Sequence, residues 1–346
     1  MVYLSLSSRI LLNIEALNMT ESVGNFVRHR RAPIVIPTSN GYQLKYVPVI
    51  SGESLAHAYQ EILAKIADTI GLHVCNLCRQ GVFLKHADKN VFSRSGLPRP
   101  RNPKDPNEVE KIIVEKCVVE DVGGFLYTDA TLKRTSRIAF GYMIPAIDSI
   151  KSSAAEAQFH VRYDPQAKGR EAGQMIYNIE VGSALYVLSS ALDVCSIGVS
   201  SLELERGRPR PIVSIDERTR RVEASIKALE IMITQQLFGA KKSRFNPQWR
   251  IMSLALLVSA PLPLNVMPAH SRKYVRETAT TVEQAVKSLN TGVAGISEEA
   301  YLYYYAEENI EEPIAQDIEV YRASTPVEAF MKAREKALEL FRRRCG

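Results

Sequence analysis

A cluster of arginines in residues 18–33, NMTESVGNFVRHRRAP, has the chemistry of a phosphate-binding site. Guanidinium groups neutralise the phosphates of an extended nucleic acid, and short polar side chains add hydrogen bonds to backbone oxygens or to a 2′-hydroxyl group. The alternative is an ordinary exposed turn that carries surface arginines. On the first interpretation the contacting side chains are Asn18, Thr20, Ser22, Asn25, Arg28, Arg30 and Arg31.

The stretch ISGESLAH, residues 50–57, places a glycine turn directly before a predicted helix. Free N–H groups at a helix N-terminus attract anions, and Ser51, Ser54 and His57 are close enough in sequence to add hydrogen bonds. The Gly-Lys-Ser/Thr ending of a nucleotide-binding P-loop is absent. The stretch therefore indicates either a second phosphate contact or a plain helix cap.

A segment of mixed aromatic and cationic residues, AQFHVRYDP, lies between two predicted strands. Phe159 and His160 offer ring faces on which bases stack, and Arg162 offers a charge for the nucleic-acid backbone. A structural hairpin with a histidine on its surface is the alternative. The segment predicts a stacking contact with single-stranded nucleic acid.

Residues 73–86 contain side chains of the types that bind zinc. His73, Cys75 and Cys78 follow one another at ligand spacing, and His86 comes shortly afterwards. Two ordinary thiols in an insertion would have the same spacing. We predict a structural zinc ion on His73, Cys75 and Cys78, with His86 or a residue from elsewhere in the chain as the fourth ligand, and no required cofactor. The chain has five cysteines, and an odd number in a long chain argues against a disulfide framework.

Catalysis is not indicated by any sequence motif. His29, His57 and His160 are general-base candidates for RNA cleavage, but no spacing brings two of them together. Walker, HExxH and Ser/His/Asp signatures are absent, and pairs such as Glu298 and Glu299 are typical of a solvated surface. We predict no catalytic residues and no enzymatic activity.

The composition is that of a globular protein with a full core and a basic surface. Of 346 residues, 46% are hydrophobic and 24% are charged, and the formal net charge of +6 favours a polyanionic partner. The longest apolar run, residues 251–260, is too short to cross a bilayer, and the first residues lack the pattern of a secretory signal. We expect a cytoplasmic protein without a membrane partner.

Hydrophobic periodicity predicts an α+β protein, with alternation in the strands and helical spacing behind Ser51, Ser214 and Thr325. The order strand, helix, strand, strand, helix, strand is that of a ferredoxin-like, RRM-type core with insertions. The predicted elements are a strand at 2–15, a polar loop at 18–33, an extended segment at 44–50, a helix at 51–70, strands at 136–147 and within 175–200, a loop at 205–211, a helix from 214 and a strand at 249–260.

Changes in composition divide the chain into a core and two additions. The core comprises residues 1–72 and 112–270, and residues 73–111 form an inserted subdomain. Its tip, residues 93–109, is rich in proline and basic residues, so we expect it to be mobile. Residues 271–346 are predicted to be mostly helical.

Three stretches, in this order along a ferredoxin-like plan, resemble the DevR-type RAMP family, which supplies the backbone subunit of CRISPR Cascade complexes. They are NMTESVGNFVRHRRAP, ISGESLAHAYQEIL and VCNLCRQGVFLKHAD, and the similarity is greatest to the archaeal type I-A form. The resemblance covers residues 1–270. It implies a modified RRM with inserted subdomains, whose copies stack head to tail along a CRISPR RNA and present its spacer to complementary target DNA beside other Cascade subunits.

The resemblance also implies a role for each stretch. Asn18 and the three arginines would follow the guide backbone, and residues 73–115 would be a lid-like subdomain. Residues 151–174, with Phe159 and His160, would be a protruding hairpin, or thumb, that crosses the guide. Backbone subunits of double-stranded-DNA-targeting systems are not known as nucleases. The implied contact at the helix start consists of Ser51, Gly52, Glu53, Ser54 and His57.

Two other functions remain open at this point. One is a metal-independent, guide-processing endoribonuclease of the same superfamily, with His29 or His160 as acid or base. Cleavage of repeat RNA without metal would identify it. The other is a nucleic-acid-binding regulator with a zinc lid, which would form a closed two-fold dimer and not an open polymer.

Overall fold

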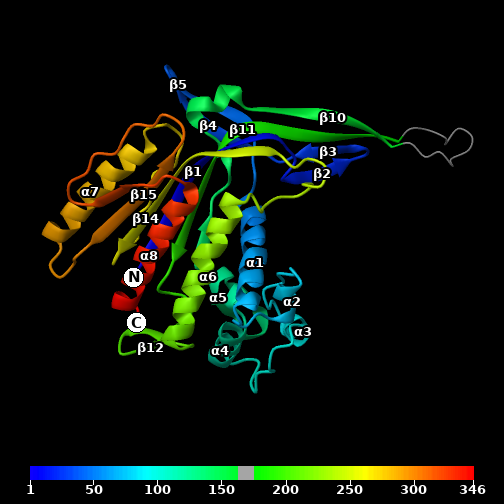
Figure 1. Cartoon of the computed structure of the whole chain (residues 1–346). Helices are drawn as coiled ribbons and strands as arrows, with labels where there is room; N and C mark the ends of the chain where they lie inside the picture. The colour runs from blue at the N-terminus through cyan, green and yellow to red at the C-terminus, as the bar shows by residue number, and fades with distance from the viewer. Residues whose placement is uncertain (163–174) are drawn as a thin grey trace, which may run out of the picture.

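The computed structural model describes residues 1–162 and 175–346 and contains one large mixed sheet of ten strands (Figure 1). Its centre is β1 (Tyr3–Glu15), which pairs antiparallel with β11 (Met175–Asp193) on one side and with β14 (Gln248–Ala260) on the other. Strand β1 is buried along most of its length because other elements cover both of its faces. These three long strands are the ones that the alternating sequence predicts.

Further strands extend the sheet on both sides of this centre. Beyond β14 come β15 (Glu299–Ala306) and β16 (Glu319–Arg322). The other edge of β11 pairs with several shorter strands, and one of these carries a further strand, β2. The strands on this side are β2 (Met19–Val23), β3 (Phe26–His29), β8 (Ile138–Phe140), β9 (Ile144–Pro145) and β10 (Ala154–Arg162).

Strands β15 and β16 correct the expectation that residues 271–346 are mostly helical. The helical spacing at the two ends of this region does form α7 (Tyr274–Gly292) and α8 (Pro326–Arg344). Between them, the sequence EAYLYYYA is rich in tyrosine, which favours strands because its ring packs well on a pleated surface. That segment completes the sheet next to β14.

Helices cover the two faces of the sheet at different places (Figure 1). Alternation along β14 places Leu254 and Leu256 on the face covered by α1 (Gly52–Thr69), α6 (Ile215–Thr234) and α8. It places Ala255 and Leu257 on the opposite face, which α7 covers. None of the helices in the described residues is both long and apolar enough to cross a bilayer.

Side-chain caps begin three of these helices where the sequence predicts them. Ser51, Ser214 and Thr325 each accept a hydrogen bond from the backbone N–H three residues later, at 3.3, 3.3 and 3.1 Å. Such a bond satisfies an N–H group that has no partner within the helix. The starts of α1, α6 and α8 are therefore confirmed.

The region between α1 and β8 forms a small lobe at one end of α1 (Figure 1). It has a hydrophobic cluster of its own, which includes Phe92, Val109 and Ile113. The elements of the lobe are α2 (Asn76–Arg79), α3 (Lys89–Arg94), α4 (Pro106–Lys116), α5 (Val118–Gly123), β6 (Phe125–Tyr127), a 3₁₀ turn (Thr128–Ala130) and β7 (Leu132–Arg134).

Residues 93–109, the tip that is expected from its composition to be mobile, have a described conformation. The carboxylate of Glu108 accepts hydrogen bonds from the backbone N–H groups of Arg101 and Asn102, at 2.7 and 2.9 Å. Asp105 caps α4, which therefore begins inside the expected tip. Local hydrogen bonds thus order the middle of the segment, and Val109 at its end packs in the hydrophobic cluster of the lobe.

Two stretches predicted as loops form β-hairpins instead. Both are too exposed to show an apolar alternation, so their sequences look like loops. Gly24 and Gly207 make the tight turns, with φ of 62° and 77° that glycine adopts without strain. The strands involved are β2 and β3, the neighbouring pair β4 (Arg31–Thr38) and β5 (Gly41–Pro48), and β12 (Val199–Glu205) with β13 (Arg208–Pro211).

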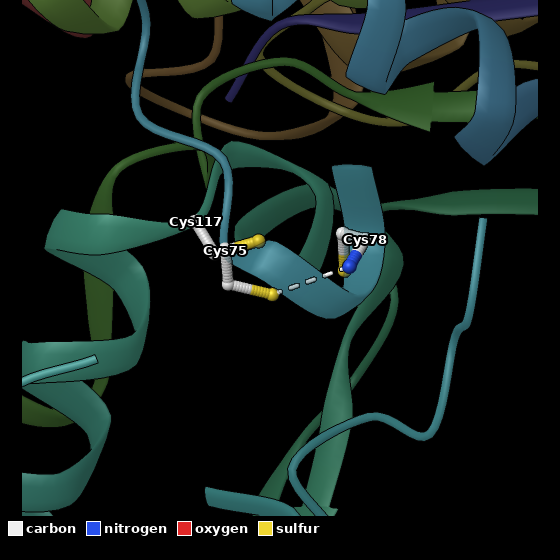
Figure 2. Close-up of side chains that lie close together, drawn as sticks. All are labelled: Cys75, Cys78 and Cys117. Carbon is white, nitrogen blue, oxygen red and sulfur yellow. Dashed lines mark hydrogen bonds between the residues drawn. The ribbon is translucent and has the colours of Figure 1, made fainter. Parts of the chain in front are cut away.

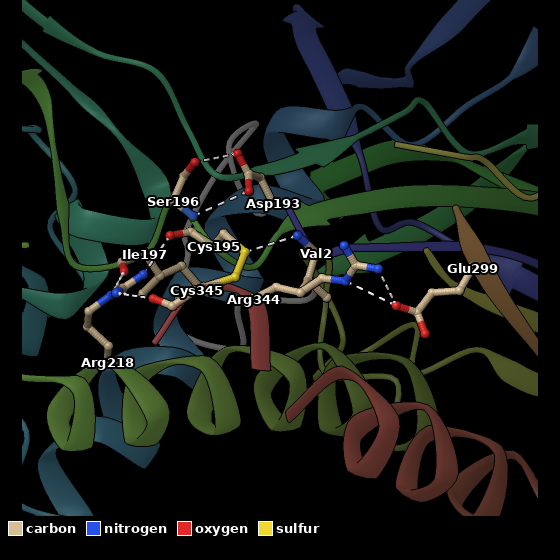
Figure 3. Close-up of a disulfide and its surroundings, with 9 residues drawn as sticks. All are labelled: Val2, Asp193, Cys195, Ser196, Ile197, Arg218, Glu299, Arg344 and Cys345. Carbon is tan, nitrogen blue, oxygen red and sulfur yellow. Dashed lines mark hydrogen bonds and ion pairs between the residues drawn. A yellow bond between two sulfur atoms is a disulfide. The ribbon is translucent and has the colours of Figure 1, made fainter. Parts of the chain in front are cut away.

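A disulfide joins Cys195 to Cys345 (Figure 3), so the argument from the odd number of cysteines was wrong for this pair. It connects the turn after β11 to the end of α8, with a Cα–Cα distance of 5.5 Å. The Arg218 guanidinium donates to the carbonyl oxygens of both cysteines, at 2.8 and 2.7 Å. The two cysteines are 150 residues apart in the sequence, so the number of cysteines alone could not reveal that folding brings them together.

Candidate nucleic-acid interface

The first two predicted phosphate contacts lie side by side in the structure. The side-chain oxygen of Asn18 accepts a hydrogen bond from the backbone N–H of Ser51 at 2.8 Å, across 33 positions of sequence. The backbone N–H of Arg30 donates to the Asn18 carbonyl oxygen, also at 2.8 Å. Asn18 therefore joins the β2–β3 hairpin to the start of α1, and its amide oxygen is used within the protein.

The β2–β3 hairpin lies next to β11 (Figure 1). Several of its polar side chains are exposed to solvent. The Arg28 guanidinium lies 5.9 Å from the centroid of the Phe26 ring. The side-chain N–H of Asn25 donates to the carbonyl oxygen of Ile176 at 2.8 Å, which ties the hairpin turn to β11. The exposed members of the predicted contact are Thr20, Ser22, Asn25, Arg28 and Arg31.

The other two arginines of the cluster are less free than Arg28. Arg30 is half-buried. Arg31 forms an ion pair with Glu180, whose side chain is only 10% exposed. The second carboxylate oxygen of Glu180 accepts a hydrogen bond from the backbone N–H of His29 at 3.1 Å. Arg31 therefore neutralises a carboxylate of the protein itself and is less available to a phosphate.

His29 lies in the core and not on the surface. Its Nε2 is 2.6 Å from Oε1 of Glu15, an oxygen that also accepts a hydrogen bond from the Tyr186 hydroxyl at 2.7 Å. Burial lowers the pKa of His29, but the hydrogen bond and the charge of Glu15 outweigh it and raise the pKa above the usual 6.5. His29 is thus a structural partner of Glu15, and the structure does not place it to act on RNA.

The start of α1 is tightly packed. Ser51 is buried, and a Cβ added at Gly52 would lie 2.5 Å from the carbonyl oxygen of Phe140. Glycine is needed here because α1 approaches β8 so closely. The backbone at the helix start therefore serves the packing of α1, while Glu53 faces solvent.

The next turn of α1 opens onto a cavity. Ser54 and His57 line a space of about 690 Å³ between α1 and the segment that follows α6. Lys65 and Lys242 also line it, so cationic groups border the space on two sides. The exposed His57 ring lies edge-on to Phe83, with 4.9 Å between the ring centroids.

The two faces of β10 carry different kinds of aromatic side chain. Phe159 is 75% exposed, whereas His160 stacks on Tyr177 with 5.2 Å between ring centroids and lies edge-on to Phe245. Strands β10 and β11 extend together beyond the rest of the sheet (Figure 1). The side chain of Arg162 and residues 163–174, which complete the predicted thumb, lie outside the described residues.

The sequence analysis overlooked a basic loop, residues 241–244, which contacts the paired strands β10 and β11 (the β10–β11 ribbon). Arg244 is exposed, and its guanidinium donates to the Tyr177 hydroxyl at 2.9 Å. Lys241 and Lys242 precede it in the loop between α6 and β14. The signal was the run AKKSRF, which is basic but short. Together with Arg28 and Phe159, the loop makes the β2–β3 and β10–β11 region cationic and aromatic.

The predicted zinc ligands are only partly brought together. Cys75 and Cys78 are buried, and a third buried thiol, Cys117, lies beside them (Figure 2). The three sulfur atoms lie within 4.8 Å of one another. His86 also reaches Cys75, but His73 is exposed and is not part of the cluster. The sequence analysis overlooked Cys117 because it is far from the Cys-x-x-Cys pair along the chain.

Two kinds of comparison connect this fold and surface to known proteins. Residues 6–279 match the model of the family described as CRISPR-associated negative auto-regulator DevR/Csa2. The chain also resembles a chain of a CRISPR RNA-guided surveillance complex, with a TM-score of 0.51, 11% sequence identity, and 96% of this chain and 99% of that chain covered. At this identity the structural match concerns the fold alone.

Relatives in Saccharolobus solfataricus are much more similar in sequence. One, named CRISPR-associated aCascade subunit Cas7/Csa2 2, is 41% identical over 291 residues, which cover 83% of this chain and 89% of the relative. Another, named CRISPR-associated protein Cas7/Csa2 1, is 37% identical over 322 residues, which cover 90% of this chain and 96% of the relative. The resemblance noted from three short stretches is thereby confirmed, and the chain belongs to the DevR/Csa2 family of CRISPR-associated proteins.

Proposed function

We propose that this protein is a CRISPR RNA-binding backbone subunit of a Cascade-type complex. The observation that carries the proposal is its 41% identity over 291 residues to a protein named as an aCascade subunit. The exposed Arg28, the exposed Phe159 and the basic loop at 241–244 support it, because a cationic surface with free aromatic faces suits single-stranded nucleic acid.

The core of the protein is a modified RRM in this proposal. In a ferredoxin-like fold the first strand lies between the third and the fourth, and both helices cover one face. Strand β1 lies between β11 and β14, and α1 and α6 share one face of the sheet. The short strands β8 and β9, antiparallel to β11, take the place of the second strand. Strands β15 and β16 enlarge the sheet beyond that plan.

Binding in this proposal does not depend on the sequence of the RNA. Arginine and lysine side chains neutralise phosphates, and Phe159 stacks on whichever base lies against it. Specificity is then left to pairing between the guide and a complementary DNA strand. Copies assemble head to tail along the guide with other Cascade subunits, in the cytoplasm. The protein has no catalytic role, in keeping with the burial of His29 against Glu15.

The test is whether CRISPR RNA remains bound when the protein is purified from cells that co-express a guide. We expect an ultraviolet absorbance ratio typical of a nucleic-acid complex and guide sequences in the extracted RNA. The protein does not need to read bases, so guides with unrelated spacers should be retained equally. Protein that is free of nucleic acid and also fails to bind single-stranded RNA at low salt would refute the proposal.

Substitutions in the arginine cluster should distinguish residues that bind phosphate from residues that stabilise the fold. Arg28→Ala is expected to weaken RNA binding about five-fold at 0.1 M salt and to flatten the plot of log affinity against log salt by about 0.7, the value for one phosphate of a single strand. The loss should be equal for two unrelated RNA sequences. Affinities measured at several salt concentrations provide the check.

Arg31→Ala is the matched comparison, because Arg31 is paired with Glu180. We expect it to lower the midpoint of thermal unfolding and to change the salt dependence less than Arg28→Ala does. If Arg28→Ala binds like the wild type at every salt concentration, the β2–β3 hairpin is not part of the phosphate track. If it loses affinity for one sequence alone, the protein reads bases.

A second candidate function rests on the family description, which names a negative auto-regulator. A regulator would bind its own control region as a closed two-fold dimer, in contrast to an open helical assembly. Electron microscopy with long RNA distinguishes the two. We expect filaments, and a dimer that persists unchanged in the presence of RNA would favour the regulator.

A further inference from the structure

Three buried thiols of the lobe meet where it packs against the main hydrophobic cluster. Cys75 lies shortly after α1, and its sulfur caps α2, whereas Cys117 precedes α5 without a side-chain capping bond. The backbone N–H of Val118 donates to the carbonyl oxygen of His73 at 2.9 Å, so the two segments run side by side. Cys78 lies one turn beyond Cys75. The sulfur atoms of the three cysteines are within 4.8 Å of one another (Figure 2).

This spacing is that of thiolates around one metal ion. Four ligands arranged tetrahedrally around zinc, with Zn–S bonds of about 2.3 Å, place their sulfur atoms about 3.8 Å apart. Thiols are weak hydrogen-bond donors and acceptors, and the hydrogen bonds here are long: the Cys78 N–H donates to the Cys75 sulfur at 3.5 Å, and the Cys78 thiol donates to Oε1 of Glu120 at 3.8 Å. Three such groups in one buried space therefore contribute little to stability without an ion.

Two buried ionisable groups lie on another side of Cys75. Ligand atoms of His86 and Glu120 lie within 4.8 Å of the Cys75 sulfur and of each other. Nδ1 of His86 is 2.8 Å from Oε1 of Glu120, and the two side chains are 0% and 2% exposed. Neither ring nitrogen of His86 forms a hydrogen bond with good geometry among the described residues, and Oε2 of Glu120 has no partner there. Unsatisfied polar atoms in a core cost about 1–3 kcal/mol each, so they indicate a missing partner.

We propose that Cys75, Cys78, Cys117 and His86 bind a structural zinc ion. Three thiolates and one imidazole are a common ligand set for structural zinc. Glu120 then orients the imidazole as a hydrogen-bond partner, as carboxylates do for metal-bound histidines. The ion replaces the thiol protons, which pass to solvent. Of the four ligands expected from sequence, this site keeps three and exchanges His73 for Cys117.

All four ligands belong to the lobe, so the ion would join its first and middle segments. Cys75 and Cys78 lie at the beginning of the lobe, and Cys117 lies between α4 and α5. The three cysteines pack in the main hydrophobic cluster, whereas the outer part of the lobe has a cluster of its own, so the ion would lie at the junction of the two clusters. The proposal concerns this junction and is independent of RNA binding.

The test is the metal content of the full chain, purified without chelator and without a metal-binding tag. We expect one zinc ion per chain by mass spectrometry of the elements, and we expect Cys117→Ser and His86→Ala to lower this value. His73→Ala is the matched control and should keep it. In protein from cobalt-supplemented cells, we expect the visible absorption of tetrahedral cobalt with thiolate ligands.

A measurement on the wild type keeps the test decisive if the variants fail to fold. The three thiols should react slowly with a thiol reagent in the native protein and quickly after a chelator is added. Zinc well below one ion per chain together with no effect of chelator would overturn the proposal. The proposal would also be overturned by a disulfide between two of these cysteines in protein purified from a reducing cytosol. Full zinc content in a folded Cys117→Ser variant would overturn it as well.

Discussion

Asp121→Asn should lower the free energy of unfolding by about 3–5 kcal/mol, the usual cost of removing one partner of a buried ion pair. Asp121 is fully buried between two guanidinium groups. It forms ion pairs with Arg134 and, at 2.8 Å, with Arg221, and it accepts a hydrogen bond from the Gly198 N–H at 3.1 Å. The amide has nearly the same shape but leaves both arginines without their shared counter-ion.

The pH dependence gives the same experiment a second readout. Burial raises the pKa of Asp121, but the charges of Arg134 and Arg221 outweigh it and hold the pKa below the usual 3.8. The carboxylate therefore contributes its full stability above pH 3.8, and the contribution is lost as the pH falls through the lower pKa of the folded state. The difference in free energy of unfolding between the wild type and Asp121→Asn should therefore become smaller as the pH falls below 3.8.

Chemical denaturation at neutral pH and at several acidic pH values measures both effects. Asp68→Asn is the matched control, because Asp68 pairs with Arg79 at 2.8 Å on the surface, where each side chain is 49% exposed. Exposed pairs of this kind contribute about 0–1 kcal/mol. Equal losses in the two variants would show that the buried cluster is no more important than a surface pair.

Phe159→Ala should weaken the binding of single-stranded RNA by about 1–3 kcal/mol, the contribution of one base stacked on an aromatic ring. The side chain is 75% exposed on β10, so its removal leaves the core intact. A stacking contact does not neutralise a phosphate. The plot of log affinity against log salt should therefore keep the slope of the wild type, in contrast to Arg28→Ala.

Two substitutions make this prediction specific. Phe159→Leu keeps an apolar side chain without a ring and should lose nearly as much affinity as Phe159→Ala. Val161→Ala changes the next exposed apolar residue on the same face of β10 and should bind like the wild type. If the leucine variant retains full affinity, the contact is hydrophobic and not stacking. If all three variants bind equally, the β10–β11 ribbon does not touch the RNA.

Local patterns in the sequence were sufficient for the long elements and for the family. Strands β1, β11 and β14 alternate or are continuously apolar, and Ser51, Ser214 and Thr325 start their helices with hydrogen bonds that span three residues. Such features need no information from the rest of the chain. The three stretches that resemble the DevR-type family are likewise contiguous, so they were recognisable without a fold.

The secondary structure was mistaken in two exposed, polar hairpins and in one partly buried strand. The β2–β3 and β12–β13 hairpins have too few buried side chains to leave a period in the sequence. Strand β15 lies between two amphipathic helices, and its run of tyrosines was passed over. In these cases the pairing partner in the sheet, and not the segment itself, determines the strand.

The site, by contrast, was decided by contacts between distant residues. Residue types identified Arg28 and Phe159 as candidates, and the fold leaves both exposed. Only the tertiary structure buries His29 against Glu15 and pairs Arg31 with Glu180. Charge and residue type are properties of the sequence, but whether a charge faces solvent or a partner depends on which segments pack together.

The thiol cluster illustrates the same limit most clearly. The sequence by itself determined a Cys-x-x-Cys pair with His73 before it, and it left the fourth zinc ligand open between His86 and a residue from elsewhere. Folding the lobe turns His73 outward and brings Cys117 to the pair. A metal ion requires its ligands to converge within a few ångströms, and convergence of segments some forty residues apart is a property of the packed chain alone.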